Sequence, residues 1–132
     1  MIVDTSALVA IVFEEPEAND LVRMLSRASR AGIGTPTLAE LGIVLHARLG
    51  RDPRALVTRL LDEFDIAEIP FGAPHWREAL DAFARYGRGR HPAGLNFGDC
   101  LTYAVAALAR EPLLYVGEDF SATDLARAEI DS

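Results

Sequence analysis

The sequence predicts an α/β fold in which a central parallel sheet is covered by helices on both faces. Short apolar segments with strand character alternate along the chain with longer segments of helical periodicity. The 132 residues have the size of one ordinary domain, so we expect a single domain over residues 1–132. Half of the residues are hydrophobic and a quarter are charged, which is typical of a globular domain with one core.

The first segment predicts how a strand and a helix meet. Residues 1–3 are apolar and end at Asp4, which indicates a short buried strand. Thr5 or Ser6 is expected to cap a helix that begins near Ala7, because hydroxyl oxygens accept hydrogen bonds from the N–H groups of a first turn.

The remaining elements continue the alternation. Thr35 and Pro36 give one helix an N-cap and an N-terminal proline, and Gly50 ends it as a C′ glycine. Residues 121–124 resemble a capping box, with Asp at the usual Glu or Gln position, and predict a short last helix. Whether residues 129–130 add an edge strand stays open. In chain order, we expect a helix over 17–29, a strand over 31–34, helices over 36–49 and 53–64, a strand over 66–70, helices over 74–86 and 97–110, and a strand over 113–116.

Composition and charge argue against some classes of protein. The net charge of −7 disfavours a general polyanion binder, since affinity for nucleic acid rests mainly on phosphate neutralisation. Every basic residue other than histidine is an arginine, and four of these cluster over residues 77–90, where a local phosphate contact could form. No apolar run approaches the ~18 residues that cross a membrane. The single cysteine, Cys100, cannot form an intramolecular disulfide, so a cytoplasmic location is expected.

Four carboxylates stand where an apolar segment has just ended or begun. Asp4 and Asp119 follow expected strands, whereas Glu40 and Asp99 lie near the starts of expected helices. Ligands of such folds bind outside the carboxyl ends of the strands, so the four acids could share one site. A carboxylate beside buried apolar residues is costly unless it is paired or bound to a metal. Hard oxygen ligands suit Mg²⁺ or Mn²⁺, which predicts a divalent cation and phosphodiester chemistry.

Each acid also has a simpler explanation. Asp4 could cap the helix that follows it, and Asp119 could be a turn residue. Glu40 and Asp99 could interact favourably with helix dipoles, each for about 0.3–1 kcal/mol. Two carboxylates about 4 Å apart repel by roughly 4 kcal/mol at an effective dielectric near 20. Four clustered acids would therefore be a standing cost to the fold unless a cation joined them.

Four stretches of the chain resemble the PIN-domain ribonucleases, and specifically the VapC toxins of bacterial toxin–antitoxin pairs. The stretches read Met-Ile-Val-Asp-Thr-Ser-Ala at residues 1–7, Thr-Leu-Ala-Glu-Leu at 37–41, His-Pro-Ala-Gly-Leu-Asn-Phe-Gly-Asp-Cys at 91–100 and Gly-Glu-Asp-Phe-Ser at 117–121. The long third stretch is the most specific, and the resemblance runs end to end.

The resemblance implies a three-layer α/β/α sandwich and a metal-dependent endoribonuclease. It makes Asp4, Glu40, Asp99 and Asp119 the catalytic ligands of Mg²⁺ or Mn²⁺, with Asp4 and Asp99 central. It makes Thr5, Ser6 and Asn96 hydrogen-bonding residues that orient the carboxylates and the metal waters. It also implies an RNA substrate, a homodimer and a cognate VapB-type antitoxin as partner.

Two positions depart from the family pattern. Subfamily members often carry Lys and Asn beside the last glycine, where this chain has Val116 and Glu118. Loss of the lysine removes a candidate phosphate contact. Glu118 could replace a water in the metal shell or point to solvent, and we favour solvent.

Further residues are assigned by their place in the chain. Arg88, Arg90 and His91 are candidates for substrate binding in the loop over residues 87–95, and a solvated or purely structural loop is the alternative. Six large apolar residues are expected in the core, although some on the early helices could form a dimer face: Phe13, Leu21, Leu25, Trp76, Leu80 and Phe83.

The sequence disfavours two rival functions. A non-catalytic PIN module acting as an interaction partner is disfavoured, because such a module has no need of four clustered like charges. A phosphatase of the haloacid-dehalogenase type is disfavoured because that chemistry wants a second Asp two residues after the first. That position is Ser6 here.

Overall fold

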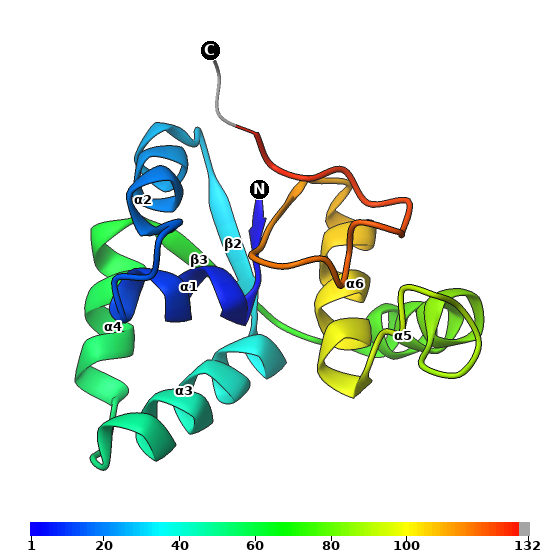
Figure 1. The fold of residues 1–132 in the computed structure, drawn as a ribbon, viewed down its shortest axis with the longest axis horizontal. Helices are drawn as coiled ribbons and strands as arrows, with labels where there is room; N and C mark the ends of the chain where they lie inside the picture. The colour runs from blue at the N-terminus through cyan, green and yellow to red at the C-terminus, as the bar shows by residue number, and fades with distance from the viewer. Residues whose placement is uncertain (130–132) are drawn as a thin grey trace.

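Four parallel strands form the centre of the molecule, which a computed structural model describes over residues 1–129 (Figure 1). They are β1 (Ile2–Val3), β2 (Ala31–Gly34), β3 (Ile66–Ile69) and β4 (Leu113–Leu114). The strand order is β3-β2-β1-β4, and each neighbouring pair is parallel. The predicted α/β fold with a parallel sheet is therefore confirmed. The strands over 66–70 and 113–116 are shorter than predicted.

Helices cover both faces of the sheet, which makes three layers. Figure 1 shows α1, α2, α3 and α4 on one side of the strands, and α5 and α6 on the other. The helix bounds are α1 Thr5–Val12, α2 Ala18–Arg27, α3 Thr35–Leu49, α4 Arg54–Glu63, α5 Ala73–Tyr86 and α6 Phe97–Ala109. No helix within residues 1–129 is long and apolar enough to cross a membrane.

Alternation along the short strands separates two cores. Ile2 of β1 packs in the core beneath α5 and α6, whereas Val3 packs in the core beneath α1 to α4. Leu113 and Leu114 of β4 divide in the same way. Successive side chains of a strand point to opposite faces, so two residues suffice to join both cores.

Gly34 ends β2 and allows α6 to lie close against the sheet. A Cβ atom at this position would stand 2.8 Å from Cγ2 of Val105 in α6. Gly34 is also the N-cap of α3, and Thr35 is the first helical residue. The prediction that Thr35 is the N-cap is therefore wrong. The sharp turn from strand to helix falls on the residue without a side chain. Gly50 does end α3 in a left-handed conformation, as predicted, with φ of 71°.

The N-cap of α1 is neither Thr5 nor Ser6 but Asp4, which confirms the alternative that Asp4 caps the helix after it. Asp4 caps the helix, which begins at Thr5 rather than near Ala7. The carboxylate of Asp4 accepts hydrogen bonds from the backbone N–H of Ser6 at 3.1 Å and from its hydroxyl at 2.7 Å. A carboxylate can accept two hydrogen bonds at once, and here both come from Ser6. Asp4 therefore occupies the N-cap position that was predicted for Thr5 or Ser6.

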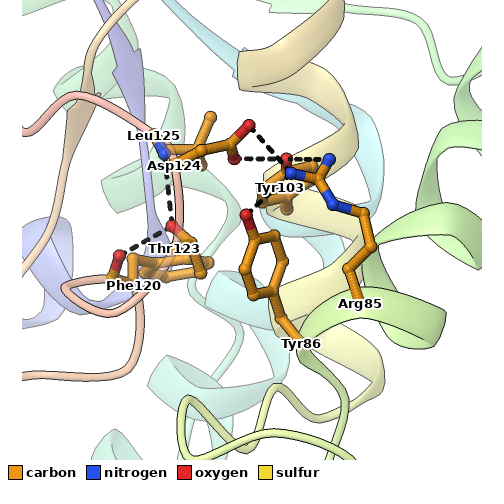
Figure 2. A network of polar contacts seen from close by, with 7 residues as sticks. All are labelled: Arg85, Tyr86, Tyr103, Phe120, Thr123, Asp124 and Leu125. Carbon is orange, nitrogen blue, oxygen red and sulfur yellow. Dashed lines mark hydrogen bonds and ion pairs between the residues drawn. The ribbon is translucent and has the colours of Figure 1, made fainter.

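The short last helix that was predicted to start at residues 121–124 does not form within residues 1–129. Its side chains bond elsewhere: the hydroxyl of Ser121 donates to the carbonyl of Glu118, and that of Thr123 donates to the carbonyl of Phe120. Asp124 accepts from Tyr103 and Arg85 and so cannot close a capping box (Figure 2). Beyond this turn, Arg127 forms a single bridge to Leu113. The suggested edge strand at 129–130 includes Ile130, which lies outside the described residues.

The core prediction holds for α2 and fails for α5. Leu21 and Leu25 are buried, and Phe13 is partly buried beneath Arg48. In contrast, three large side chains of α5 are exposed: Trp76 by 50%, Leu80 by 61% and Phe83 by 40%. The buried face of α5 consists instead of Ala79, Ala82 and Tyr86. The small alanines allow α5 to approach α6 closely, which turns the bulky stripe outward.

Candidate metal centre

Asp4 and Ser6 join the ends of β1 and β4, which are neighbours in the sheet. Asp4 follows β1 and is only 8% exposed. The hydroxyl of Ser6 donates to Asp4 and accepts from the backbone N–H of Val116 at 3.0 Å, just beyond β4. One hydroxyl thus fixes the Asp4 carboxylate relative to the segment that leads to Asp119.

Glu40 enters the same region from α3. The hydroxyl of Thr5 lies 2.5 Å from Oε1 of Glu40 and donates to it. On the other side, a Cβ atom at Gly98 would stand 2.5 Å from Oε2 of Glu40. The first turn of α6 therefore lies directly against this carboxylate, in a space that no other residue type at position 98 would leave open.

Asp99 is held by the predicted N-cap of α6. The side-chain oxygen of Asn96 accepts from the backbone N–H of Asp99 at 2.8 Å. The backbone N–H of Asn96 donates to Oδ2 of Asp99 at 3.1 Å, which completes a capping box. The box fixes the orientation of the Asp99 carboxylate at the start of the helix.

The surroundings of Asp99 disfavour the charged form of its carboxyl group. Burial, together with the charges of Asp119, Asp4 and Glu40, raises its pKa from the usual 3.8 to about 6. The hydrogen bond from the backbone of Asn96 acts in the opposite direction. All four acids of the sequence prediction are thus near enough to interact electrostatically, although they come from four separate segments.

Asp119 stands on the turn that follows β4. Gly117 begins the turn with φ of 97°, a conformation that side chains rarely adopt. Phe120 anchors the turn, because its ring is buried and packs on Tyr115 at 5.3 Å. The side chains of Glu118 and Asp119 are exposed, and exposure of Glu118 agrees with the expectation that it faces solvent.

The donor set fits a hard divalent cation. Within residues 1–129, no three His, Cys, Asp or Glu side chains are already arranged to hold one ion. Three of the carboxylates instead bond to neighbours that fix them locally, namely Ser6, Thr5 and the Asn96 backbone. The four side chains offer only oxygen ligands, and a cation between them would relieve the repulsion that Asp99 feels. The absence of a side chain at Gly98 leaves room for the Glu40 carboxylate beside the first turn of α6.

A second polar network, which sequence reasoning missed, secures the segment after Asp119 (Figure 2). The hydroxyl of Tyr103 donates to Asp124 at 2.5 Å, and the guanidinium of Arg85 donates to the other oxygen at 3.2 Å. The bond from Tyr103 lowers the pKa of Asp124, and burial raises the pKa of Tyr103. The C-terminal segment is therefore fastened to α5 and α6. In the sequence, this network is indicated only by Asp124, which fitted a capping box equally well.

The loop between α5 and α6 carries the three predicted substrate residues and leads directly into Asn96. The Nδ1 atom of His91 accepts from the backbone N–H of Ala93 at 3.0 Å, and its ring meets that of Tyr86 edge-on at 5.1 Å. Arg90 lies over the ring of Phe83 at 5.4 Å, and Arg88 is exposed. His91 thus helps to shape the loop, whereas the two arginines present charge at its surface.

Comparison with known proteins identifies the family of the chain. The family model of the PIN domain matches residues 1–125. Ribonuclease VapC36 of Mycobacterium tuberculosis is 49% identical over 126 residues, which cover 95% of this chain and 91% of the relative. The chain therefore belongs to the PIN-domain family and, within it, to the VapC ribonucleases.

Solved structures share the fold at low sequence identity. The crystal structure of M. tuberculosis VapC20, described as a sarcin-ricin loop cleaving toxin, matches with a TM-score of 0.76 at 18% identity over 95% of both chains. VapBC2 from Rickettsia felis, solved bound to a promoter DNA fragment, matches with a TM-score of 0.71 at 16% identity over 97% of this chain and 96% of the other. These likenesses support the three-layer architecture.

Proposed function

We propose that this protein is a metal-dependent endoribonuclease that hydrolyses RNA phosphodiester bonds, and the toxin of a type II toxin–antitoxin pair. The observation that carries the proposal is that the charges of three acids from three other segments, Asp4, Glu40 and Asp119, act on the carboxylate of Asp99. The relationship to VapC36, which is named a ribonuclease, supports the same reaction. We also propose that residues 1–132 form one PIN domain.

The four acids have different roles in holding the metal. Asp4 and Asp99 are the central ligands of Mg²⁺ or Mn²⁺, and Glu40 and Asp119 complete one or two ion positions. The cation supplies Lewis acidity that activates water and neutralises charge on the phosphate. Thr5, Ser6 and Asn96 keep the carboxylates in place through the hydrogen bonds described above.

The loop between α5 and α6 supplies the contacts to the RNA backbone. Arg88 and Arg90 are exposed, and guanidinium groups pair with phosphate through two parallel hydrogen bonds. His91 is the weaker candidate for RNA contact, since its Nδ1 atom accepts from the loop backbone and its ring packs against Tyr86. The acidic centre repels phosphate until a cation is bound, so substrate binding depends on metal binding.

The biological setting follows from the family. We propose a cognate VapB-type antitoxin as partner, a homodimer as the working form and the cytoplasm as the location. The solved VapBC2 complex of a structurally similar protein supports the choice of partner. The single cysteine is consistent with a reducing compartment.

A non-catalytic PIN module is the less supported alternative. Such a module would bind a partner without metal and would tolerate loss of the acids. The raised pKa of Asp99 reflects a cost to the fold, and partner binding alone does not explain this cost.

Cleavage of total cellular RNA by purified, antitoxin-free protein tests the proposal. With Mg²⁺ or Mn²⁺ we expect discrete fragments, and with EDTA we expect none. Asp4→Asn should abolish the fragments, whereas Asp62→Asn, at an exposed acid of α4, should leave them unchanged. A folded wild type that binds Mn²⁺ and cleaves no RNA would favour the non-catalytic module.

A further inference from the structure

An apolar groove adjoins the candidate metal centre between α3 and the start of α6. Its cavity has a volume of about 460 Å³. Glu40 and Gly98 line it, and these residues also meet at the metal centre. Any occupant of the groove therefore lies beside the cluster of four acids.

The groove cannot hold a phosphate itself. Glu40 is the only charged residue among those that line it, and it is negative. The remaining walls are formed mainly by apolar side chains, among them Ile43, Val44 and Leu101. Such a surface repels an anion and favours a flat, uncharged group.

Phe97 forms an aromatic wall of the groove, and its side chain is not buried in the core. The residue opens α6, directly after the Asn96 cap, and its side chain is 80% exposed. Ile43 faces the groove from α3 and is 70% exposed. Proteins read unpaired RNA by stacking bases on aromatic side chains in such positions.

The charge of the whole chain favours a base as the occupant. At a net charge of −7, neutralisation of phosphates can supply little of the affinity for RNA. Contacts to the uncharged parts of a nucleotide must then supply more of it. The bases of a duplex are stacked on one another and cannot reach a side chain at the rim of a groove.

We infer that this groove binds an unpaired RNA base next to the scissile phosphate, with Phe97 as the stacking surface. The inference rests on the proposed ribonuclease function and adds a base-binding site to it. Phe97 is then a binding residue of the substrate, and Ile43 packs against the opposite side of the base.

Binding of short single-stranded oligonucleotides tests the inference without knowledge of the natural target. The measurement is fluorescence anisotropy with labelled oligo(A), and with an abasic ribose-phosphate chain of equal length, in Ca²⁺ buffer. We expect Phe97→Ala to weaken oligo(A) binding between about fivefold and about 100-fold. The variant should bind the abasic chain as the wild type does, and Phe97→Tyr should restore oligo(A) binding.

Two controls separate this site from a general change in the protein. Trp76→Ala removes another exposed aromatic side chain, on α5 and outside the groove, and should leave oligo(A) binding unchanged. The thermal shift produced by Mn²⁺ should be the same in Phe97→Ala and wild type, because Phe97 supplies no metal ligand.

The outcomes distinguish the base site from its alternatives. Equal oligo(A) binding by Phe97→Ala and wild type, in a protein that cleaves RNA, overturns the base site and leaves the nuclease intact. A change in molecular mass of Phe97→Ala by light scattering, with oligo(A) binding unchanged, assigns the groove to a protein interface instead. Absence of any RNA cleavage by the wild type overturns the proposed function itself.

Discussion

The energetic cost of placing four acids close together acts on the charged form of Asp99. Its carboxylate is half-buried and faces the charges of Asp119, Asp4 and Glu40, which together with burial raise its pKa to about 6. A bound cation would reverse this balance, because it favours the ionised form of each ligand. The metal-free protein therefore carries a strain that metal or a proton can relieve.

Replacement of this charge should stabilise the metal-free protein. We expect Asp99→Asn to raise the melting temperature in EDTA by a few degrees at pH 7.5 and to shrink the shift produced by Mn²⁺. The amide oxygen of Asn can still accept the hydrogen bond of the capping box. The variant should also lose cleavage. A variant that is destabilised in EDTA and keeps its full Mn²⁺ response would show that the acids do not share a site.

The pH dependence of this effect has a defined sign. The pKa of Asp99 is about 6 in the folded protein against 3.8 ordinarily, so the folded state binds its proton more tightly than the unfolded state. The stability from this group is present below pH 3.8 and is lost as the pH rises through 6. The advantage of Asp99→Asn over wild type in EDTA should therefore grow between pH 4 and pH 7. Melting curves over that range measure it, and a constant difference would contradict the raised pKa.

The close approach of Gly98 to Glu40 could not be predicted from the sequence. The four acids could be proposed from the sequence because each adjoins an apolar segment, and Asn96 could be predicted as a cap because it precedes a helix. Gly98 could not, because its neighbour in space, Glu40, lies in another helix far away in the chain. Close approach of two helices is a tertiary fact that no local pattern encodes.

A methyl group at this position should disturb the site and spare the fold. Its Cβ would stand 2.5 Å from Oε2 of Glu40, the far end of a flexible side chain that can move at little cost. We expect Gly98→Ala to reduce cleavage at least tenfold while the melting temperature changes little. The matched control is Gly42→Ala in α3, where nothing lies within 4 Å, and this variant should keep its activity and gain up to about 1 kcal/mol. Equal activity of the two variants would contradict a role for the space beside Glu40.

At the scale of elements, helices were easier to predict than their orientation. The bounds of α3, α5 and α6 follow from prolines, caps and periodicity. In α5, the stripe of Trp76, Leu80 and Phe83 has helical spacing, and so has the stripe of Ala79, Ala82 and Tyr86 that is buried. The stripe with the alanines is buried, because α6 lies too close to α5 for the bulkier side chains of the other stripe. The contacts of Asp124 likewise lie on other elements, which is why a helix was wrongly predicted there.

The segment that carries Asp119 depends on its anchor in α6. We expect Tyr103→Phe to remove the hydrogen bond to Asp124, to cost about 1 kcal/mol of stability and to weaken Mn²⁺ binding several-fold. The net charge is unchanged, so a loss of Mn²⁺ affinity reports on position rather than on charge. Calorimetric titration with Mn²⁺, at a temperature where both proteins are folded, measures it. Tyr86→Phe is the matched control, because that hydroxyl contacts Arg85 and not Asp124. Reduced stability with unchanged Mn²⁺ affinity would limit the network to a structural role.

At the scale of the molecule, alternation of strands and helices was enough to predict a parallel sheet. It did not predict the order β3-β2-β1-β4, because pairing between strands leaves no local signal. This order sets the ends of β1 and β4 side by side, and Ser6 bridges them. The candidate site therefore depends on topology as much as on the acids themselves.

The charge of the whole molecule predicts a weak dependence of RNA binding on salt. On a chain with a net charge of −7, the exposed pair Arg88 and Arg90 beside α6 is the main candidate for phosphate contacts. Two neutralised phosphates of a single strand give a slope of log affinity against log salt of about −1 to −2. Anisotropy with oligo(A) between low and physiological salt measures it. Arg88→Ala together with Arg90→Ala should flatten the slope by about one to two, whereas Arg59→Ala on α4 should leave it unchanged. A slope several times steeper, which the double variant leaves intact, would place the phosphate contacts on other arginines.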